Sequence, residues 1–535
     1  MPTTMPPATA EVYPRNQPFW RPPHIFTILL PLRFTREPTE ESYRDQVLRL
    51  IPQSVQHAKH IQEISTQLQL DVWKPHNIED IFPGNEIDVH VPFATLQQLK
   101  ENLLQYDIQF EVLINDVQEL IDRQTMGTHI RKKRSLANFD YNKYHPMDEI
   151  YHWMEQIKEK YSDLVTMHYL GSTYELRPIF YFKIGSPSDK QKKVIWMDCG
   201  IHAREWISVA FCQWFIKEIL HNHDSNPIYK KALQNIDFYI VPVLNIDGYI
   251  YSWQTDRLWR KSRSPHNNNT CYGVDLNRNF DSQWCSIGAS RNCSEMTFCG
   301  TGPASEPEAK ALSQLVGSLK SDILCFLTIH SYSQLILLPY GYTKNQSVNH
   351  MEMLTVAQRA ADKLKARHGT QYKVGSASQI LYSNSGSSRD WATDLGIPFS
   401  YTFELRDNGT YGFQLPENQI KPTCEETTDG MITILEHINE KYFNSATSIF
   451  SEGLWMSLFL SCIISTYLTV VLPWDTPCNC TVAVTPVCAP RRVPARVFVS
   501  LAEGHPRGSA IICNGCMLSG SFSVCSANSS SSCQT

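Results

Sequence analysis

Between about residues 140 and 440, short apolar segments alternate with longer segments of helical periodicity. The short segments are rich in β-branched and aromatic residues and predict buried strands at 193–198, 238–244, 323–329 and 399–403. The longer segments repeat apolar residues every three to four positions and predict helices at 147–161, 207–221, 306–320 and 351–368. Strands that alternate with helices favour an α/β sandwich around a mixed sheet.

A smaller unit precedes this region. Its pattern predicts the order strand, helix, strand, helix, strand, helix at 45–51, 54–68, 87–91, 94–106, 109–114 and 116–123. This is the pattern of a small α+β domain. A basic run from Arg131 to Arg134 follows it. Such a run is usually a solvated surface, but between two folded domains it indicates a cleavage site.

The composition favours a secreted protein of more than one domain. The chain of 535 residues exceeds the usual size of a single domain. Its net charge of -5 gives no indication of nucleic acid as a partner. None of the 16 cysteines precedes Cys199, and N-glycosylation sequons begin at Asn268, Asn292, Asn345 and Asn408. Together these features indicate an oxidising compartment.

Polar residues follow three of the predicted strands of the larger region, each at its downstream end. His202 and Glu205 come just after the first strand, His330 follows the third, and Glu404 follows the fourth. In open α/β sheets, ligands bind at the carboxyl ends of the strands. We therefore expect these four side chains to meet at one edge of the sheet.

The spacing of His202 and Glu205 is compatible with a metal site. A His and a Glu three apart are weak evidence alone, because a solvated surface turn gives the same pattern. A buried core histidine is likewise the simple alternative for His330. The recurrence of polar residues at the same strand ends favours metal binding instead. Catalytic zinc takes three protein ligands of this kind and keeps one position open.

Several longer motifs carry a resemblance to a known family. They run in order from about 140 to 440 and include His202-Ala-Arg-Glu205-Trp, Leu258-Trp-Arg260-Lys, Gly273-Val-Asp275-Leu-Asn277-Arg278, His330-Ser-Tyr332, Leu381-Tyr382, Ser387-Ser-Arg389-Asp-Trp391 and Phe403-Glu404-Leu-Arg. In these motifs the chain resembles the zinc carboxypeptidases of the A/B family. The resemblance implies an α/β fold with a mixed eight-stranded sheet flanked by helices, preceded by a small α+β prodomain that covers the active site.

The resemblance also implies the catalytic roles. His202, Glu205 and His330 would bind one Zn²⁺ per chain, which lowers the pKa of a water and polarises the scissile carbonyl. Glu404 would act as general base and acid, and Arg260 would stabilise the oxyanion.

Further residues would hold the ligand and the substrate. Asp275 would fix the tautomer of His202, and Asn277 and Arg278 would hold the terminal carboxylate of a peptide or protein substrate. Tyr382 would close over the bound residue. The residues implied to line the approach are Arg204, Arg257, Ser331, Tyr332 and Phe413. For each arginine the simpler alternative is a surface ion pair.

Arg389 stands where the family has its specificity residue, by alignment on Leu381, Tyr382, Asp390 and Trp391. A buried guanidinium without a protein partner is costly, so we expect the pocket to favour a substrate that supplies Glu or Asp at its C-terminus. The alternatives are that Arg389 points to solvent or pairs with Asp390, and that the pocket prefers hydrophobic residues.

Two functions other than catalysis are alternatives for this chain. A peptide-binding pseudoenzyme would require the loss of a zinc ligand or of the base, and His202, Glu205, His330 and Glu404 are all present. A membrane adhesion module would leave the carboxylate clamp unexplained. We therefore favour a peptide hydrolase.

The family resemblance implies three disulfide bonds, Cys199 with Cys212, Cys271 with Cys293, and Cys285 with Cys299. Sequence alone leaves three connectivities open for the last four cysteines. Cys325 and Cys424 are then left as buried free thiols.

The resulting domain organisation has five parts. Residues 1–41 form an N-terminal segment, a possible imperfect signal region whose apolar octet is broken by Pro31. Residues 42–134 form the propeptide domain, which a proprotein convertase would separate between Arg134 and Ser135 from the catalytic domain at 135–442.

The two C-terminal parts concern the membrane. Residues 454–472 are uncharged and long enough to span a bilayer, although a core helix is the alternative. With the small residues at 444–446 they resemble a glycolipid-anchor signal, so we expect 443–472 to attach the protein to membrane lipid at the cell surface. Residues 473–535 form an irregular tail rich in Cys, Ser and Pro that no anchor signal explains.

Overall fold

The computed structural model describes residues 45–125, 136 and 139–443, and most of these belong to a domain built on an eight-stranded sheet. The strand order is β13-β12-β14-β11-β7-β8-β6-β5. The strands are β5 Val165–Ser172, β6 Pro178–Ile184, β7 Lys193–Cys199, β8 Ile236–Val241, β11 Ile323–Ser331, β12 Leu335–Leu338, β13 Lys373–Ser376 and β14 Phe399–Leu405. The central β14, β11, β7 and β8 are parallel, whereas β12 and β6 pair antiparallel with β14 and β8. The expected mixed eight-stranded sheet is therefore confirmed.

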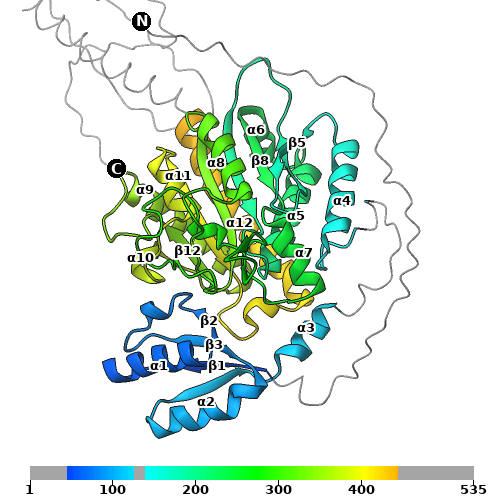
Figure 1. Cartoon of the computed structure of the whole chain (residues 1–535). Helices are drawn as coiled ribbons and strands as arrows, with labels where there is room; N and C mark the ends of the chain where they lie inside the picture. Colours follow the sequence, from blue (N-terminus) through cyan, green and yellow to red (C-terminus); the bar gives the residue numbers. More distant parts are fainter. Residues whose placement is uncertain (1–44, 126–135, 137–138, 444–535) are drawn as a thin grey trace, which may run out of the picture. The chain divides into compact units, whose positions relative to one another are not determined.

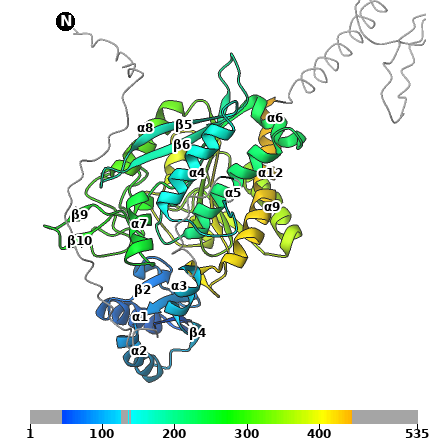
Figure 2. The same ribbon diagram turned by 90° about the vertical axis from the view of Figure 1, so that its right-hand side faces the viewer.

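Helices cover both faces of this sheet (Figures 1 and 2). On one face α12 packs against α5, α6 and α9, and Cys212 of α5 is bonded to Cys199 of β7. On the other face the ring of Trp391 in α11 lies against Phe326 of β11. The helices of this domain are α4 Met147–Lys160, α5 Trp206–Asn222, α6 Pro227–Asn235, α7 Ile246–Gln254, α8 Pro307–Leu319, α9 His350–His368, α10 Ala377–Ile380, α11 Ser388–Asp394 and α12 Ile420–Phe443.

The smaller domain has the four-stranded antiparallel order β2-β3-β1-β4. Its elements are β1 Gln46–Leu50, α1 Val55–Gln67, β2 Asp71–Lys74, β3 Ile87–Val91, α2 Phe93–Gln105, β4 Phe110–Ile114 and α3 Val117–Thr125. Leu48 and Val89 on one sheet face pack with Ile61 and Leu99 of α1 and α2. Apolar residues of both faces are thus buried, because Val47 and other residues on the opposite face pack against the large domain.

Three disulfides link Cys199 with Cys212, Cys271 with Cys293, and Cys285 with Cys299, the pairings that the family resemblance implies. Cys325 and Cys424 are buried free thiols. These bonds fit the oxidising compartment expected from the sequence.

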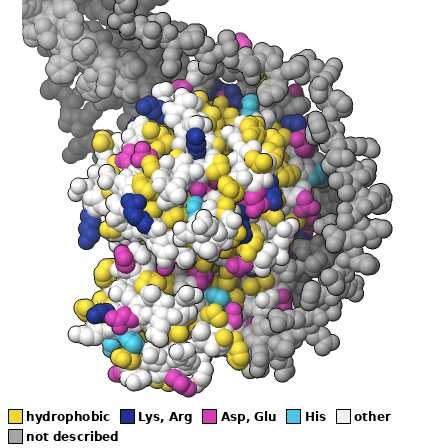
Figure 3. Space-filling view, in the orientation of Figure 1, with side chains coloured by type: hydrophobic (Ala, Val, Ile, Leu, Met, Phe, Trp, Pro, Cys, Tyr) yellow, Lys and Arg dark blue, Asp and Glu magenta, His cyan; other side chains and the backbone are white. Residues whose placement is uncertain are grey.

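The surface carries acidic and basic side chains interspersed on the face shown in Figure 3. Within the part of the chain that the structure describes, no helix has the length and hydrophobicity that a membrane span requires. Several features predicted from the sequence lie outside the described residues. They are the cleavage site at Arg134 and Ser135, the N-terminal segment 1–41, the predicted anchor segment after Phe443 and the tail 473–535.

Candidate active site

His202, Glu205 and His330 form a buried cluster whose ligand atoms all lie within 4.8 Å of one another. His202 Nδ1 lies 2.7 Å from Glu205 Oε1, and His330 Nδ1 lies 3.1 Å from both Glu205 Oε2 and His202 Nδ1. Burial disfavours a charged Glu205, but His202 and His330 outweigh this and hold its pKa below the ordinary value. Two imidazole nitrogens and one carboxylate that converge in this way fit zinc.

The local backbone explains how the first two ligands reach this edge. β7 ends at Cys199, and Gly200 turns the chain with φ +64. A Cβ at Gly200 would lie 2.9 Å from Val209 Cγ2, so the turn has no room for a side chain. His202 lies in the turn, and Glu205 is the N-cap residue that directly precedes α5.

His202 is held from behind by a carboxylate. Its Nε2 lies 3.1 Å from Asp275 Oδ1, while Asp275 Oδ2 accepts hydrogen bonds from Nε and Nη2 of Arg260 at 3.1 and 2.9 Å. Burial opposes ionisation of Asp275, but Arg260, Arg278 and His202 hold its pKa well below the usual range. The arrangement directs His202 Nδ1 toward the cluster.

The remaining edge of the Arg260 guanidinium faces the cluster. Its Nη1 is buried without a hydrogen-bond partner, and Glu205 Oε1 lies 3.7 Å away. A buried N–H without a partner costs free energy in the unliganded protein. Such a donor is available to an oxygen that develops negative charge near the cluster.

Glu404 lies directly beside His330, since the two are register partners on the parallel strands β14 and β11. It is 8% exposed, and burial together with the charge of Glu205 raises the pKa of Glu404 well above its ordinary value. His202, Arg260 and Arg389 oppose this rise. A carboxyl group in this position can take and give a proton at the edge of the cluster.

Asn277 and Arg278 lie in a buried 3-10 turn, Leu276–Arg278, that Asp275 caps by accepting from the Asn277 amide at 3.0 Å. Arg278 Nε donates to Gly288 O at 2.8 Å, which fixes the direction of the guanidinium. Tyr382 is close by: burial raises its pKa, while Arg278 and Arg260 oppose the rise. The clamp and the closing tyrosine expected from the sequence therefore lie together.

The small domain occupies the approach to this site. Asp71 of β2 accepts from Arg204 Nη1 at 2.8 Å and from Trp73 Nε1 at 2.8 Å. Asp88 of β3 accepts from the Tyr332 hydroxyl at 3.0 Å, and His76 Nδ1 contacts the Tyr382 hydroxyl. Sequence reasoning missed His76, Asp71 and Asp88, because only the fold shows which residues of the small domain face the site.

Three further residues expected along the approach have defined places. The ring of Phe413 lies between Trp73, at 5.0 Å, and the Arg204 guanidinium, at 4.2 Å. Ser331 donates its amide to Glu205 Oε2 at 3.2 Å, and its hydroxyl is buried without a partner. Arg257 lies behind the approach rather than on it, since its Nε, Nη1 and Nη2 donate to Gln124 Oε1 and to the carbonyls of Arg204 and Phe413.

Arg389 differs from the sequence-based expectation. It is buried, 2% exposed, but it is not without a protein partner, because its Nε donates to Asp390 Oδ1 at 2.9 Å. The expectation of an unpaired guanidinium was therefore wrong, and the alternative of pairing with Asp390 holds. Asp390 lies in the first turn of α11, where its backbone amide donates a hydrogen bond to Ser387 Oγ. This bond fixes Asp390 beside Arg389. Nη2 also lies 2.9 Å from Asp390 Oδ1 and 3.4 Å from Ser387 Oγ, and Nη1 makes only a long contact of 3.4 Å with Thr402 Oγ1.

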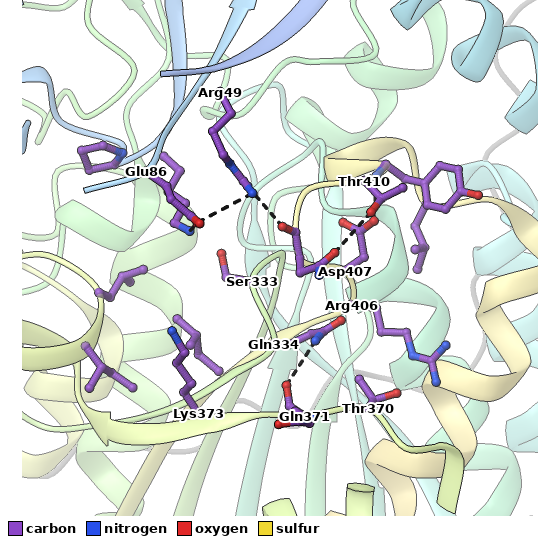
Figure 4. A pocket seen from close by; sticks show the side chains of 18 of the residues that line it. Arg49, Glu86, Ser333, Gln334, Thr370, Gln371, Lys373, Arg406, Asp407 and Thr410 are labelled. Atoms are coloured by element: carbon purple, nitrogen blue, oxygen red, sulfur yellow. Dashed lines mark hydrogen bonds and ion pairs between the residues drawn. The ribbon is translucent and has the colours of Figure 1, made fainter. Parts of the chain in front are cut away.

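A cavity of about 1000 Å³ adjoins the site between the small domain and the loops that follow β11 and β14. Arg49 points into it and pairs with Glu86, 3.7 Å away, as Figure 4 shows. Leu381 and Tyr382 form part of its wall. None of the three residues of the metal cluster is among those that line it.

Comparison with known proteins agrees with this geometry. The zinc carboxypeptidase family matches residues 150–430, and the carboxypeptidase activation peptide family matches 48–124. The chain therefore belongs to the zinc carboxypeptidases, peptide hydrolases that use Zn²⁺ and act on peptide C-termini. The activation peptide implies activation by cleavage.

Individual members of the family are similar to this chain over most of their length. The chain is 60% identical to carboxypeptidase O of Bos taurus over 371 residues, 69% of this chain and 97% of that protein. It is 62% identical to carboxypeptidase O of Homo sapiens over 348 residues, 65% of this chain and 91% of that protein. The crystal structure of thrombin activatable fibrinolysis inhibitor superposes with a TM-score of 0.70 at 40% identity, covering 74% of this chain and 98% of that one.

Proposed function

We propose that this protein is a secreted proenzyme that removes single C-terminal residues from peptides and proteins, with a preference for Glu and Asp. His202, Glu205 and His330 would hold the zinc ion, which would supply a Lewis acid and lower the pKa of a water molecule. Glu404 takes the proton of the attacking water and delivers it to the leaving amine. Asn277 and Arg278 hold the substrate carboxylate, which restricts cleavage to the last peptide bond.

The observation that carries the acidic preference is the buried guanidinium of Arg389. It lies close enough to Glu404 to lower the pKa of that carboxyl, and its Nη1 makes only a long contact of 3.4 Å with Thr402 Oγ1, whereas its Nη2 lies 2.9 Å from Asp390 Oδ1. A substrate carboxylate can accept from Nη1. Because Asp390 already neutralises part of the charge, we expect discrimination of roughly 10- to 100-fold, the effect of one hydrogen bond to a charged group.

The Arg389–Asp390 pair also supports an alternative. If Asp390 neutralises Arg389 fully, the pocket would gain little from a substrate carboxylate, and hydrophobic C-terminal residues would be preferred. A library of peptides that differ only in the last residue separates the two. The proposal expects the activated enzyme to release Glu and Asp first, and to release nothing with a zinc chelator or in Glu404→Gln. First release of Phe or Leu would favour the alternative, and no release from any peptide would favour a peptide-binding pseudoenzyme.

For activation, we propose cleavage by a proprotein convertase after Arg134, in the basic run Arg131 to Arg134. The contacts of Asp71, Asp88 and His76 support latency before this cleavage, because they occupy the approach. Replacing Arg131 and Arg134 by Ala should leave a larger, inactive precursor. Full activity of that precursor would refute the proposal.

For localisation, we propose attachment to the outer face of the plasma membrane through residues 443–472. The uncharged run at 454–472 and the small residues before it support a lipid anchor. A phosphatidylinositol-specific phospholipase should release the enzyme from the surface of expressing cells. Retention after that treatment would support a spanning helix, and a protein wholly in the medium would exclude both.

A further inference from the structure

A chain of buried hydrogen bonds lies behind His330. His330 Nε2 lies 3.1 Å from Thr328 Oγ1, and the Thr328 hydroxyl donates to Asp198 Oδ1 at 2.8 Å. Trp196 Nε1 donates to the other oxygen, Asp198 Oδ2, at 2.9 Å. The side chains of His330, Thr328, Asp198 and Trp196 are each at most 1% exposed, so water does not compete for these hydrogen bonds.

The strand register produces this chain. Thr328 and His330 are two residues apart on β11 and therefore project from the same face of the sheet. Thr328 and Asp198 are register partners on the parallel strands β11 and β7, and Trp196 is two residues from Asp198. The side chains follow one another across the sheet in fixed positions.

The number of protons on each group fixes which atom donates in each of these hydrogen bonds. A threonine hydroxyl has a single proton, and here it goes to Asp198. Toward His330 the same oxygen can only accept, so His330 Nε2 carries the proton and Nδ1 keeps its lone pair. That Nδ1 is the atom that lies 3.1 Å from Glu205 Oε2 and from His202 Nδ1.

We propose that Thr328 and Asp198 are positioning residues for the metal site, which set the tautomer and ring direction of His330 through the Thr328 hydroxyl. Both His202 and His330 are then oriented by a buried aspartate. Asp275 contacts His202 Nε2 directly, whereas Asp198 acts on His330 through Thr328. The proposal rests on His330 being a zinc ligand, as the proposed function has it. A bond between β7 and β11 that only stabilises the sheet is the competing explanation.

The test measures zinc affinity rather than activity. Thr328→Val keeps the shape and removes the hydroxyl, and Thr328→Ser restores it. Thr427→Val is the control, because Thr427 is also fully buried and its hydroxyl donates to Thr423 O within α12. Each variant of the full chain is stripped of metal, checked for folding by urea unfolding, and titrated with Zn²⁺ against a chelating dye.

We expect Thr328→Val to weaken zinc binding by roughly 10- to 100-fold, the usual effect of losing a partner behind a histidine ligand. The zinc affinities of Thr328→Ser and Thr427→Val should stay within about threefold of that of the native protein. A Thr328→Val protein that is less stable but binds zinc as the native protein does would overturn the proposal. Equal loss in Thr328→Ser would overturn it too, because the hydroxyl would then not be the cause. If the native chain itself bound no zinc, the proposed function would fail instead.

Discussion

His330 and Glu404 are direct register partners across the parallel strands β11 and β14. A proposed zinc ligand and the proposed base are therefore fixed to one another by backbone hydrogen bonds rather than by a loop. Strands hold reacting groups in position better than loops do, and this pairing fixes the backbone of Glu404 beside that of His330.

This arrangement predicts the effect of Glu404→Gln. The amide keeps the shape of the side chain but cannot take a proton, so we expect kcat to fall by roughly 10²- to 10⁴-fold. Zinc content, measured by atomic absorption, should be unchanged because Glu404 is not a ligand. The exposed Glu440→Gln is the control and should leave both quantities as they are. Near-native kcat in Glu404→Gln would remove Glu404 from the role of base.

The contact between Asp71 and Arg204 predicts how latency is lost. Arg204 is fully buried, so Asp71→Asn leaves its guanidinium without a charged partner and weakens the hold of the small domain. The uncleaved Asp71→Asn proenzyme should hydrolyse a small C-terminal substrate at least about tenfold faster than the uncleaved native chain, which corresponds to roughly 1.4 kcal/mol. Glu63→Gln on the exposed side of α1 should have no effect. Equal rates in all three would show that this ion pair does not contribute to latency.

Arg278 predicts a requirement for a free C-terminus. If its guanidinium holds the substrate carboxylate, Arg278→Gln should lower kcat/KM by roughly 10- to 100-fold through the loss of a charge-assisted hydrogen bond. A C-terminally amidated peptide should be a similarly poor substrate of the native enzyme. Efficient cleavage of the amidated peptide would contradict the clamp, whatever the effect of the substitution.

Glu308 predicts a pH dependence of stability away from the active site. Burial, with the nearby charges of Glu306 and Asp247, raises the pKa of Glu308 to about 8, and its Oε2 has no hydrogen-bond partner. Above the ordinary pKa of 4.5 the unfolded chain loses a proton that the folded protein keeps. This group therefore lowers stability as the pH rises from about 4.5 to 8, by ~1.4 kcal/mol per unit.

The measurement is urea unfolding of Glu308→Gln at several pH values. The variant should gain stability relative to the native protein as the pH rises from about 5 to about 8, because Gln cannot ionise. The exposed Glu440→Gln should follow the native protein. A difference between Glu308→Gln and the native protein that is independent of pH would show that Glu308 does not ionise on unfolding.

The sequence predicted β7 and β11, which are continuous apolar runs buried on both faces, and α9, which buries one apolar stripe, to within a few residues. It did not reveal α12, because Thr423, Glu426 and Thr427 are buried polar residues that interrupt its apolar stripe. It also missed β2, which is only four residues long and carries Asp71 and Lys74 at its ends.

Some features of the site could be predicted from the sequence and others could not. The metal cluster could be predicted because strand ends bring polar residues of distant segments to one edge of a parallel sheet. The pairing of Arg389 with Asp390 could not be settled, since a side chain in the first turn of a helix can point either to its neighbour or away from it. Contacts across domains, such as that of His76 with Tyr382, depend on how two cores pack and leave no local pattern.

The most direct test of the account is the selectivity of the activated enzyme, measured as kcat/KM for peptides that end in Glu, Phe and Lys. The native enzyme should prefer Glu by roughly 10- to 100-fold. Arg389→Gln, which can still donate to Asp390, should lose that preference with little change for Phe, and Arg389→Lys should keep part of it because the positive charge remains. A native enzyme that prefers Phe or Lys, or an Arg389→Gln enzyme that still prefers Glu, would contradict the assignment of Arg389 as the residue that selects the substrate.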